Sequence, residues 1–95
     1  MGRSRRRRPV RLAAKLKQIR QGLDLTQRQM ATRLHEVESD LQSGHVSEYE
    51  SGRREPSLIV LLRYSRIAGV AMETLVDDQL DLPDRLPGAT KRGRR

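Results

Sequence analysis

The sequence lacks cysteine altogether and has very few aromatic residues. Without cysteine there is no disulfide framework, no thiolate metal site and no cysteine nucleophile, and the chain needs no oxidising compartment. The aromatic residues are Tyr49 and Tyr64, so no row of rings is available on which unpaired bases could stack. These absences exclude a disulfide-stapled fold and argue against a sheet-type RNA reader.

Long hydrophobic runs are also missing. The longest uncharged apolar run, residues 58–62, is far shorter than the roughly 20 residues that cross a bilayer, so we expect a soluble cytoplasmic protein with no membrane partner. A chain of 95 residues, of which 35% are hydrophobic, suits one small domain and excludes a two-domain enzyme. No glycine-rich phosphate loop, catalytic triad order or suitable carboxylate pair is visible, so we expect neither an enzyme nor a cofactor.

Acidic residues are absent from both ends of the chain. The net charge is +8, yet five Arg fall in residues 1–9 and four basic residues in 89–95, which leaves the middle at −1. Both tails are too polar and self-repelling to pack, so we predict disordered tails that bind a polyanion such as nucleic acid. The phosphate-binding residues of the first tail are then Arg3, Arg5, Arg6, Arg7 and Arg8. The alternatives are a solubilising tail and, because residues 1–23 contain no acid, an organelle presequence.

The middle of the chain is typical of four or five short helices. Apolar residues recur every three or four positions over residues 12–23, which predicts a first helix over residues 10–21. Thr26 and Gln29 form a capping-box pattern, which predicts a second helix from Gln27.

A third helix ends at Gly52, after a loop over residues 36–42 that has no sustained period. Gln42 is a poor cap, so we expect Ser39, with Gln42 as its box partner, or Ser43 to serve as the N-cap instead. The residues on its inward side are Val46, Tyr49 and Glu50.

A fourth helix opens at Pro56 and Ser57 and ends near Gly69, and a short fifth helix covers residues 72–76. The inward residues of the fourth helix are predicted to be Leu58, Leu61, Leu62, Ser65 and Ala68. Residues 77–88 contain two prolines and should form an extended arm over the surface. Its acidic residues, expected to make a solvated linker, are Asp77, Asp78, Asp81 and Asp84.

Residues 10–76 carry a set of motifs in a characteristic order. They are Arg20, the Leu-Thr-Gln start of the second helix, Ala31, the Ser-x-x-Glu-x-Gly of the third helix, Pro-Ser before the fourth and Gly-Val before the fifth. In this order they resemble the helix-turn-helix domain of the phage repressor and Cro group, the Xre-type regulators. The resemblance implies an all-α, compact four- to five-helix DNA-binding domain. Here the turn between the second and third helices is longer than is usual in that group.

In such a domain the third helix lies in the major groove and its first residues meet base edges. The resemblance assigns base-edge positions to Ser43, Gly44 and Glu48, flanked by Gln42, His45 and Ser47. Because this set holds no Arg or Lys, the commonest bidentate reader of guanine is missing, and Glu48 can accept only from a cytosine amino group. We therefore expect modest specificity, and the alternative for Glu48 is a solvated surface charge.

Three further positions are implied to contact phosphate. Gln27 stands where the family ties the start of the second helix to the backbone, although it could instead be a second capping side chain. Arg53 and Arg54 follow the third helix in a loop that the family uses against the backbone. His35 and His45 match no recurrent metal spacing, so we expect no metal site, and a pH-sensitive contact to phosphate or base is the alternative role.

Two further features lie away from this surface. Relatives pair an Arg near the end of the first helix with a Glu near the end of the third, which implies an internal ion pair between Arg20 and Glu50. Ile59 and Val60 occupy positions that are usually polar in relatives. With the 77–88 arm they could form a partner or homodimer surface, unless the arm folds back and covers them in the monomer.

The sequence thus predicts a small transcriptional regulator that binds double-stranded DNA selectively and is associated with the nucleoid. One rival is a protein-interaction module, such as an antitoxin or adaptor, that uses the fourth helix and the arm. The other rival is a non-specific RNA or nucleoid-binding protein that works through the arginine tails alone.

Overall fold

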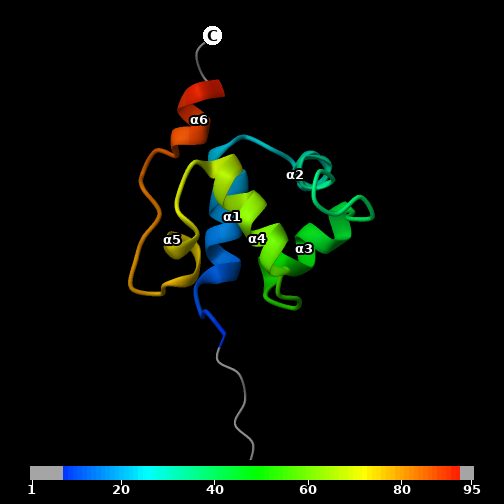
Figure 1. Cartoon of the computed structure of the whole chain (residues 1–95), viewed down its shortest axis with the longest axis horizontal. Helices are drawn as coiled ribbons and strands as arrows, with labels where there is room; N and C mark the ends of the chain where they lie inside the picture. Colours follow the sequence, from blue (N-terminus) through cyan, green and yellow to red (C-terminus); the bar gives the residue numbers. More distant parts are fainter. Residues whose placement is uncertain (1–7, 93–95) are drawn as a thin grey trace, which may run out of the picture.

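The computed structural model describes residues 8–92 and, within that range, contains helices and no strand (Figure 1). The helices are α1 (Leu12–Gly22), α2 (Gln27–Leu34), α3 (Ser43–Ser51), α4 (Leu58–Ala68), α5 (Met72–Val76) and α6 (Pro87–Arg92). The all-α prediction is confirmed for this part of the chain, and α6 is an addition that the sequence did not predict. None of these helices is long and apolar enough to cross a membrane.

Helix α1 lies at the centre of the molecule, with α2 and α3 on one side and α5 on the other (Figure 1). Its apolar stripe is buried, and Leu16 and Ile19 have no exposed surface. All of α1 to α5 contribute side chains to one core, and this core also includes Leu82 and Leu86 from the segment before α6. The periodicity that predicted α1 over residues 10–21 therefore placed the helix within two residues of its bounds.

Local sequence signals start α2 and α4 as expected. The Thr26 hydroxyl accepts a hydrogen bond from the Gln29 N–H (3.0 Å), and the Gln29 side chain accepts one from the Thr26 N–H (2.8 Å). This reciprocal capping box begins α2 at Gln27. The Ser57 hydroxyl accepts from the Val60 N–H (3.3 Å) and caps α4 in the same manner.

The start of α3 differs from the prediction. Gln42 is the N-cap, and α3 begins at Ser43, so the expected cap at Ser39 or Ser43 was wrong. His45 Nδ1 accepts the Gln42 N–H (2.9 Å), which satisfies a donor before the first turn. The preceding loop is held by tertiary contacts, because Leu41 is buried and its carbonyl accepts from His35 Nε2 (2.6 Å). The Gln42–His45 cap and the packing of Leu41 together define the start of α3.

The buried side of α4 also differs from the prediction. Val60 and Tyr64 are fully buried, whereas Leu58 is 75% exposed. Leu58 was therefore wrongly placed inward, and Val60 cannot belong to a partner surface. The residues that face the core, Val60, Leu61, Tyr64, Ser65 and Ala68, share one helical face. A continuous apolar run over residues 58–62 has no period that would distinguish this face from its neighbours.

The chain after α5 is packed against the domain and is not an arm lying loosely on the surface. Leu82 and Leu86 are buried, and Pro87 occupies the first position of α6, where its missing N–H is tolerated. The structure differs from the predicted extended arm over residues 77–88 in its last part, because α6 begins at Pro87 and continues into the predicted tail over residues 89–95. The end of that tail, residues 93–95, lies outside the described residues.

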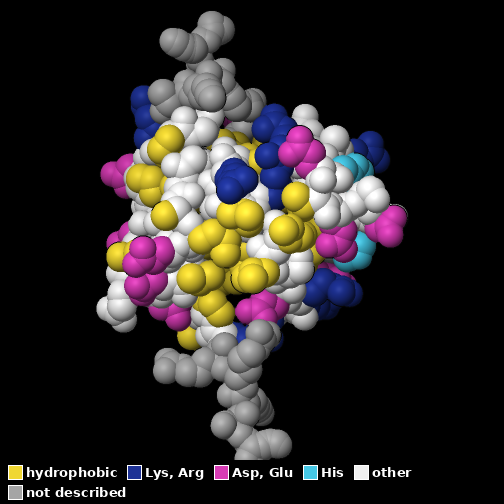
Figure 2. Space-filling model, in the orientation of Figure 1, with side chains coloured by type: hydrophobic (Ala, Val, Ile, Leu, Met, Phe, Trp, Pro, Cys, Tyr) yellow, Lys and Arg dark blue, Asp and Glu magenta, His cyan; other side chains and the backbone are white. Residues whose placement is uncertain are grey.

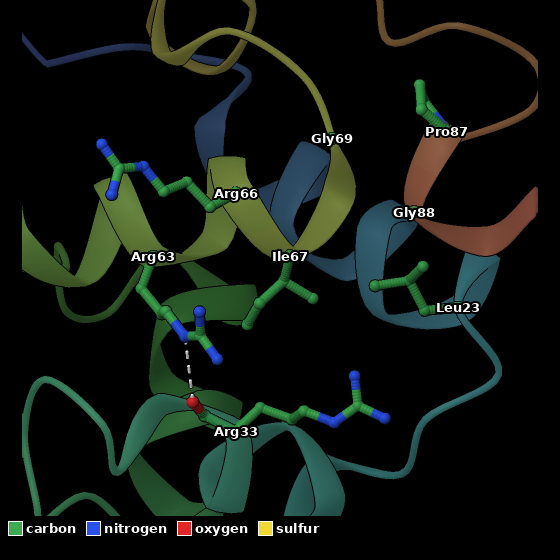
Figure 3. Close-up of a pocket in the computed structure, with 8 residues that line it drawn as sticks. All are labelled: Leu23, Arg33, Arg63, Arg66, Ile67, Gly69, Pro87 and Gly88. Atoms are coloured by element: carbon green, nitrogen blue, oxygen red, sulfur yellow. Dashed lines mark hydrogen bonds between the residues drawn. The ribbon is translucent and has the colours of Figure 1, made fainter. Parts of the chain in front are cut away.

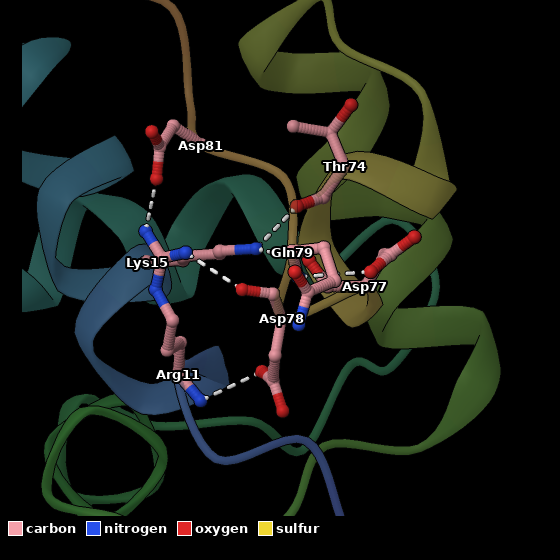
Figure 4. A network of polar contacts seen from close by, with 7 residues as sticks. All are labelled: Arg11, Lys15, Thr74, Asp77, Asp78, Gln79 and Asp81. Carbon is pink, nitrogen blue, oxygen red and sulfur yellow. Dashed lines mark hydrogen bonds and ion pairs between the residues drawn. The ribbon is translucent and has the colours of Figure 1, made fainter.

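The acidic run is bound to the start of α1. The Asp78 carboxylate accepts the backbone N–H groups of Val10 and Arg11, each at 2.9 Å, and the Arg11 guanidinium bonds the Asp78 carbonyl and Asp81 (Figure 4). These hydrogen bonds, from Arg11 first and then Val10, lower the pKa of Asp78. The prediction of a solvated linker was wrong here, because the carboxylates satisfy donors at a helix N-terminus.

Lys15 joins the same network from inside the core. Its side chain is buried, and Nζ donates to the carbonyl oxygens of Thr74 (2.7 Å) and Asp77 (2.9 Å), as Figure 4 shows. Burial lowers the pKa of Lys15, and the charge of Arg11 acts in the same direction. We call the set Arg11, Lys15, Thr74, Asp77, Asp78 and Asp81 the acidic clamp. It ties α1 to the end of α5 and to the segment that leads to α6.

Candidate nucleic-acid interface

The outward side of α3 is open to solvent. Gln42, Ser43, Gly44 and Ser47 are exposed, and a Cβ built at Gly44 would meet no atom within 4 Å. The opposite side is buried through Val46 and Tyr49, so these contacts orient the helix. The structure thus brings the expected base-edge positions together on one accessible face, flanked by the half-buried His45 and Glu48.

Glu48 and Arg54, which the resemblance assigned separately to base and phosphate, bind each other. Arg54 Nε donates to Glu48 Oε1 at 2.8 Å, and the two side chains are 55% and 38% exposed. The hydrogen bond from Arg54 lowers the pKa of Glu48. The Glu48 carbonyl also accepts the N–H groups of Arg53 (3.0 Å) and Arg54 (3.3 Å), so the turn after α3 is anchored on the same residue.

The expected ion pair between Arg20 and Glu50 is present. Arg20 Nε lies 2.7 Å from Glu50 Oε2, and Arg20 Nη2 lies 3.0 Å from Glu50 Oε1, which is a bidentate arrangement. Arg20 Nη1 also donates to the Leu25 carbonyl (2.9 Å). The hydrogen bond to Glu50 raises the pKa of Arg20. The pair, 14% and 4% exposed, fixes α3 against α1 and the turn before α2.

Gln27 has a structural partner in this pair. Its side-chain Nε2 donates to Glu50 Oε1 at 3.2 Å, so the first residue of α2 is tied to the inward side of α3. Thr26 and Gln29 supply the capping contacts at this helix start. Gln27 therefore connects the two helices of the motif. Its position at the start of α2 is still compatible with the expected phosphate contact.

Tyr64 lies in the core behind the ion pair, and no local pattern predicted its environment. Its hydroxyl is the buried side-chain polar atom that, among the described residues, has no hydrogen-bond partner. Burial raises the pKa of Tyr64, and the charge of Glu50 adds to that effect. The hydroxyl is thus desolvated without compensation.

Tyr64→Phe is expected to leave the free energy of unfolding unchanged or to raise it by up to about 1 kcal/mol, because it removes only an unsatisfied hydroxyl. Tyr64→Ala should lower it by about 3–5 kcal/mol, because it leaves a cavity in the core. Urea unfolding followed by circular dichroism measures both. A loss of more than about 1 kcal/mol in Tyr64→Phe would mean that the hydroxyl has a partner in solution.

The remaining predicted residues have varied surroundings. Of the first tail, Arg8 is described, and its Nε lies 3.9 Å from Glu55 Oε1. Arg3, Arg5, Arg6 and Arg7 lie outside the described residues. His35 is turned toward the Leu41 carbonyl, and residues 8–92 contain no cluster of three or more side chains that could hold a metal ion.

An apolar surface lies on the face that carries α4 and α5. Leu58 and Ile59 (51% exposed) project from α4, and Val76 is exposed on α5. Figure 2 shows hydrophobic side chains gathered on this face, with basic side chains beside them. The segment after α5 does not cover Ile59, so this residue keeps the accessibility that a partner surface requires.

Some residues that shape this interface were not singled out from the sequence. Lys15 and Asp78 position α1 through the acidic clamp, whose hydrogen bonds join residues that are 59 to 70 positions apart in sequence. A signal for Lys15 was present, because it falls inside the apolar stripe formed by Leu12, Leu16 and Ile19. No comparable local signal marks Asp78.

Comparison with known proteins agrees with this geometry. A family model described as helix-turn-helix matches residues 16–75, from within α1 to the end of α5, and so includes α2, α3 and the Arg20–Glu50 pair. No curated protein and no solved structure matches the chain. The match covers more than half of the chain and leaves α6 outside. The chain therefore belongs to the Xre-type helix-turn-helix family of DNA-binding regulators.

Proposed function

We propose that this protein is a small transcriptional regulator that binds double-stranded DNA selectively, with α3 in the major groove. The observation that carries the proposal is the open outward side of α3 at Ser43, Gly44 and Ser47, opposite an inward side held by the Arg20–Glu50 pair. In this family geometry α2 crosses the backbone, which places Gln27 at a phosphate. Gln42 and His45 flank the base-edge positions at the start of α3.

The Glu48–Arg54 ion pair on this surface can be exchanged for contacts to DNA. A free carboxylate facing DNA would be repelled by phosphates, and the Arg54 guanidinium neutralises it in the unbound protein. An exposed pair of this kind contributes little to stability, because water screens both charges, whereas a good contact to a base edge discriminates by about 1–3 kcal/mol. DNA can therefore displace the pair, with Arg54 and Arg53 moving to phosphates and Glu48 accepting from a cytosine amino group.

Two further contributions complete the proposal. The basic tails, including Arg8, add phosphate contacts that do not read sequence and make binding salt-dependent. Leu58 and Ile59 pair across a two-fold axis in a homodimer, which would space two α3 helices about 34 Å apart on a palindromic site.

Selection of preferred duplexes from a random library tests the function, and Glu48→Ala tests the reading face. We expect wild type to favour its selected duplex over random DNA and Glu48→Ala to lose about 5- to 100-fold discrimination at one base position. Glu73→Ala, which removes the same charge from the exposed side of α5, should leave base preference unchanged. An unaltered preference in Glu48→Ala would show that another surface reads the bases.

A further inference from the structure

A groove separate from the proposed DNA surface lies between α2, α4 and α6. It has a volume of about 740 Å³. Figure 3 shows Arg33 on α2, Arg63 and Arg66 on α4, and Pro87 and Gly88 on α6, with Ile67 and Leu23 between these walls. The wall formed by α6 lies beyond residues 16–75, the part of the chain that matches the family.

The wall that α6 provides is seated directly on the end of α4. A Cβ at Gly88 would overlap the Ile67 carbonyl oxygen, and one at Gly69 would lie 2.9 Å from Pro87 Cβ. Glycines at these two positions let the backbones approach closely. Backbone packing, and not flexible side chains, therefore holds this wall of the groove in place.

The groove is rich in unpaired positive charge. Within the described part of the chain, no carboxylate pairs with the guanidinium of Arg33 or Arg66. Arg63 donates to the Arg33 carbonyl (3.3 Å) and pairs with Glu36 Oε1 (2.9 Å). The Glu36 side chain is 67% exposed, so it shows how a carboxylate approaches this wall from solvent.

We propose that this groove binds an acidic, aliphatic peptide segment of a partner protein. Guanidinium groups recognise carboxylates in a bidentate manner, and the aliphatic floor of Ile67 and Leu23 matches apolar side chains of a peptide. A nucleic-acid backbone has no aliphatic side chain that would pack on that floor. The acidic run after α5 does not occupy the groove, because Asp78 and Asp81 are held in the acidic clamp.

The site lies apart from the surface proposed to bind DNA. Arg33 is at the C-terminal end of α2, whereas Gln27, the residue proposed to approach phosphate, is at its start. Arg63 and Arg66 are on α4, beyond the turn that carries Arg53 and Arg54. Peptide and DNA can therefore bind at the same time, and failure of one proposal leaves the other standing.

Fluorescence anisotropy with a labelled peptide of alternating Glu and Leu tests the groove in the full chain. Arg33→Gln and Arg66→Gln should each weaken peptide binding about fivefold, whereas Lys17→Gln, which removes the same charge from an exposed position on α1, should change it less than about twofold. Glu36→Gln frees Arg63 and should strengthen binding about twofold or more, with Glu73→Gln as its matched control.

Three outcomes would overturn the proposal. The first is equal binding of an analogue in which Gln replaces every Glu, or Ser every Leu. The second is an equal loss in Lys17→Gln and the groove variants, which would reduce the effect to net charge. The third is evidence that the groove binds phosphate. Either Arg33→Gln would weaken binding to a DNA duplex as much as it weakens binding to the peptide, or inorganic phosphate would displace the labelled peptide as effectively as unlabelled peptide does.

Discussion

Glu50→Ala is expected to lower the free energy of unfolding by about 3–5 kcal/mol. The substitution leaves the Arg20 guanidinium, 14% exposed, with the Leu25 carbonyl as its remaining partner, and it removes the acceptor of Gln27. An uncompensated buried charge accounts for most of the loss. Urea unfolding measured by circular dichroism gives the number, and the same variant should bind DNA less tightly because α3 loses its anchor to α1.

Glu48→Ala is the matched control, since it removes a carboxylate of the same type from the same helix. Its partner Arg54 is 55% exposed, so solvent replaces the lost contact and the free energy of unfolding should change far less than in Glu50→Ala. Equal destabilisation by the two variants would contradict the assignment of Glu50 to the inner side and Glu48 to the outer side of α3.

Gly69→Ala is expected to destabilise the protein by about 3 kcal/mol, roughly twice the effect of Gly52→Ala. Both glycines end a helix with a left-handed backbone, at φ values of 78° and 83°, where an L-residue costs about 1–2 kcal/mol. A Cβ at Gly52 has its nearest neighbour, Ala13 Cβ, at 3.9 Å. A Cβ at Gly69 lies 2.9 Å from Pro87 Cβ and 3.0 Å from the Gly88 nitrogen, which adds overpacking against α6.

The comparison separates backbone strain from the packing of α6. Thermal or urea unfolding of the two variants measures the difference, and Gly69→Ala should also weaken binding of the acidic peptide because the groove wall shifts. Identical stability losses would contradict the seating of α6 on the end of α4, and with it the groove.

Those parts of the fold that depend on local pattern could be predicted. The stripe over residues 12–23 and the capping box at Thr26 located α1 and α2, because helix period and capping chemistry are properties of neighbouring residues. The buried face of α4 could not be chosen, because residues 58–62 are apolar at every position. The start of α3 was missed because Gln42 and His45 form its cap, and neither is among the residue types that usually mark one.

The candidate site was predictable to a similar extent. The Arg20–Glu50 pair followed from the resemblance, together with the inward position of Glu50. The Glu48–Arg54 pair was missed because each residue already had a DNA role assigned, and the turn at Gly52 that brings them together changes direction between them. The acidic clamp depends on contacts between the start of α1 and the segment after α5, and α6 depends on its packing on the end of α4. A single sequence offers no periodic or capping signal for either.

The acidic clamp links hydrogen exchange at the start of α1 to the position of Asp78 after α5. The amide hydrogens of Val10 and Arg11 are covered by the Asp78 carboxylate, which is 68 and 67 residues away along the chain. Their exchange with solvent deuterium therefore requires that these hydrogen bonds to Asp78 first open. Protection of these two amides thus measures how often Asp78 leaves the start of α1, a contact that lies wholly outside residues 16–75, the part of the chain that matches the family.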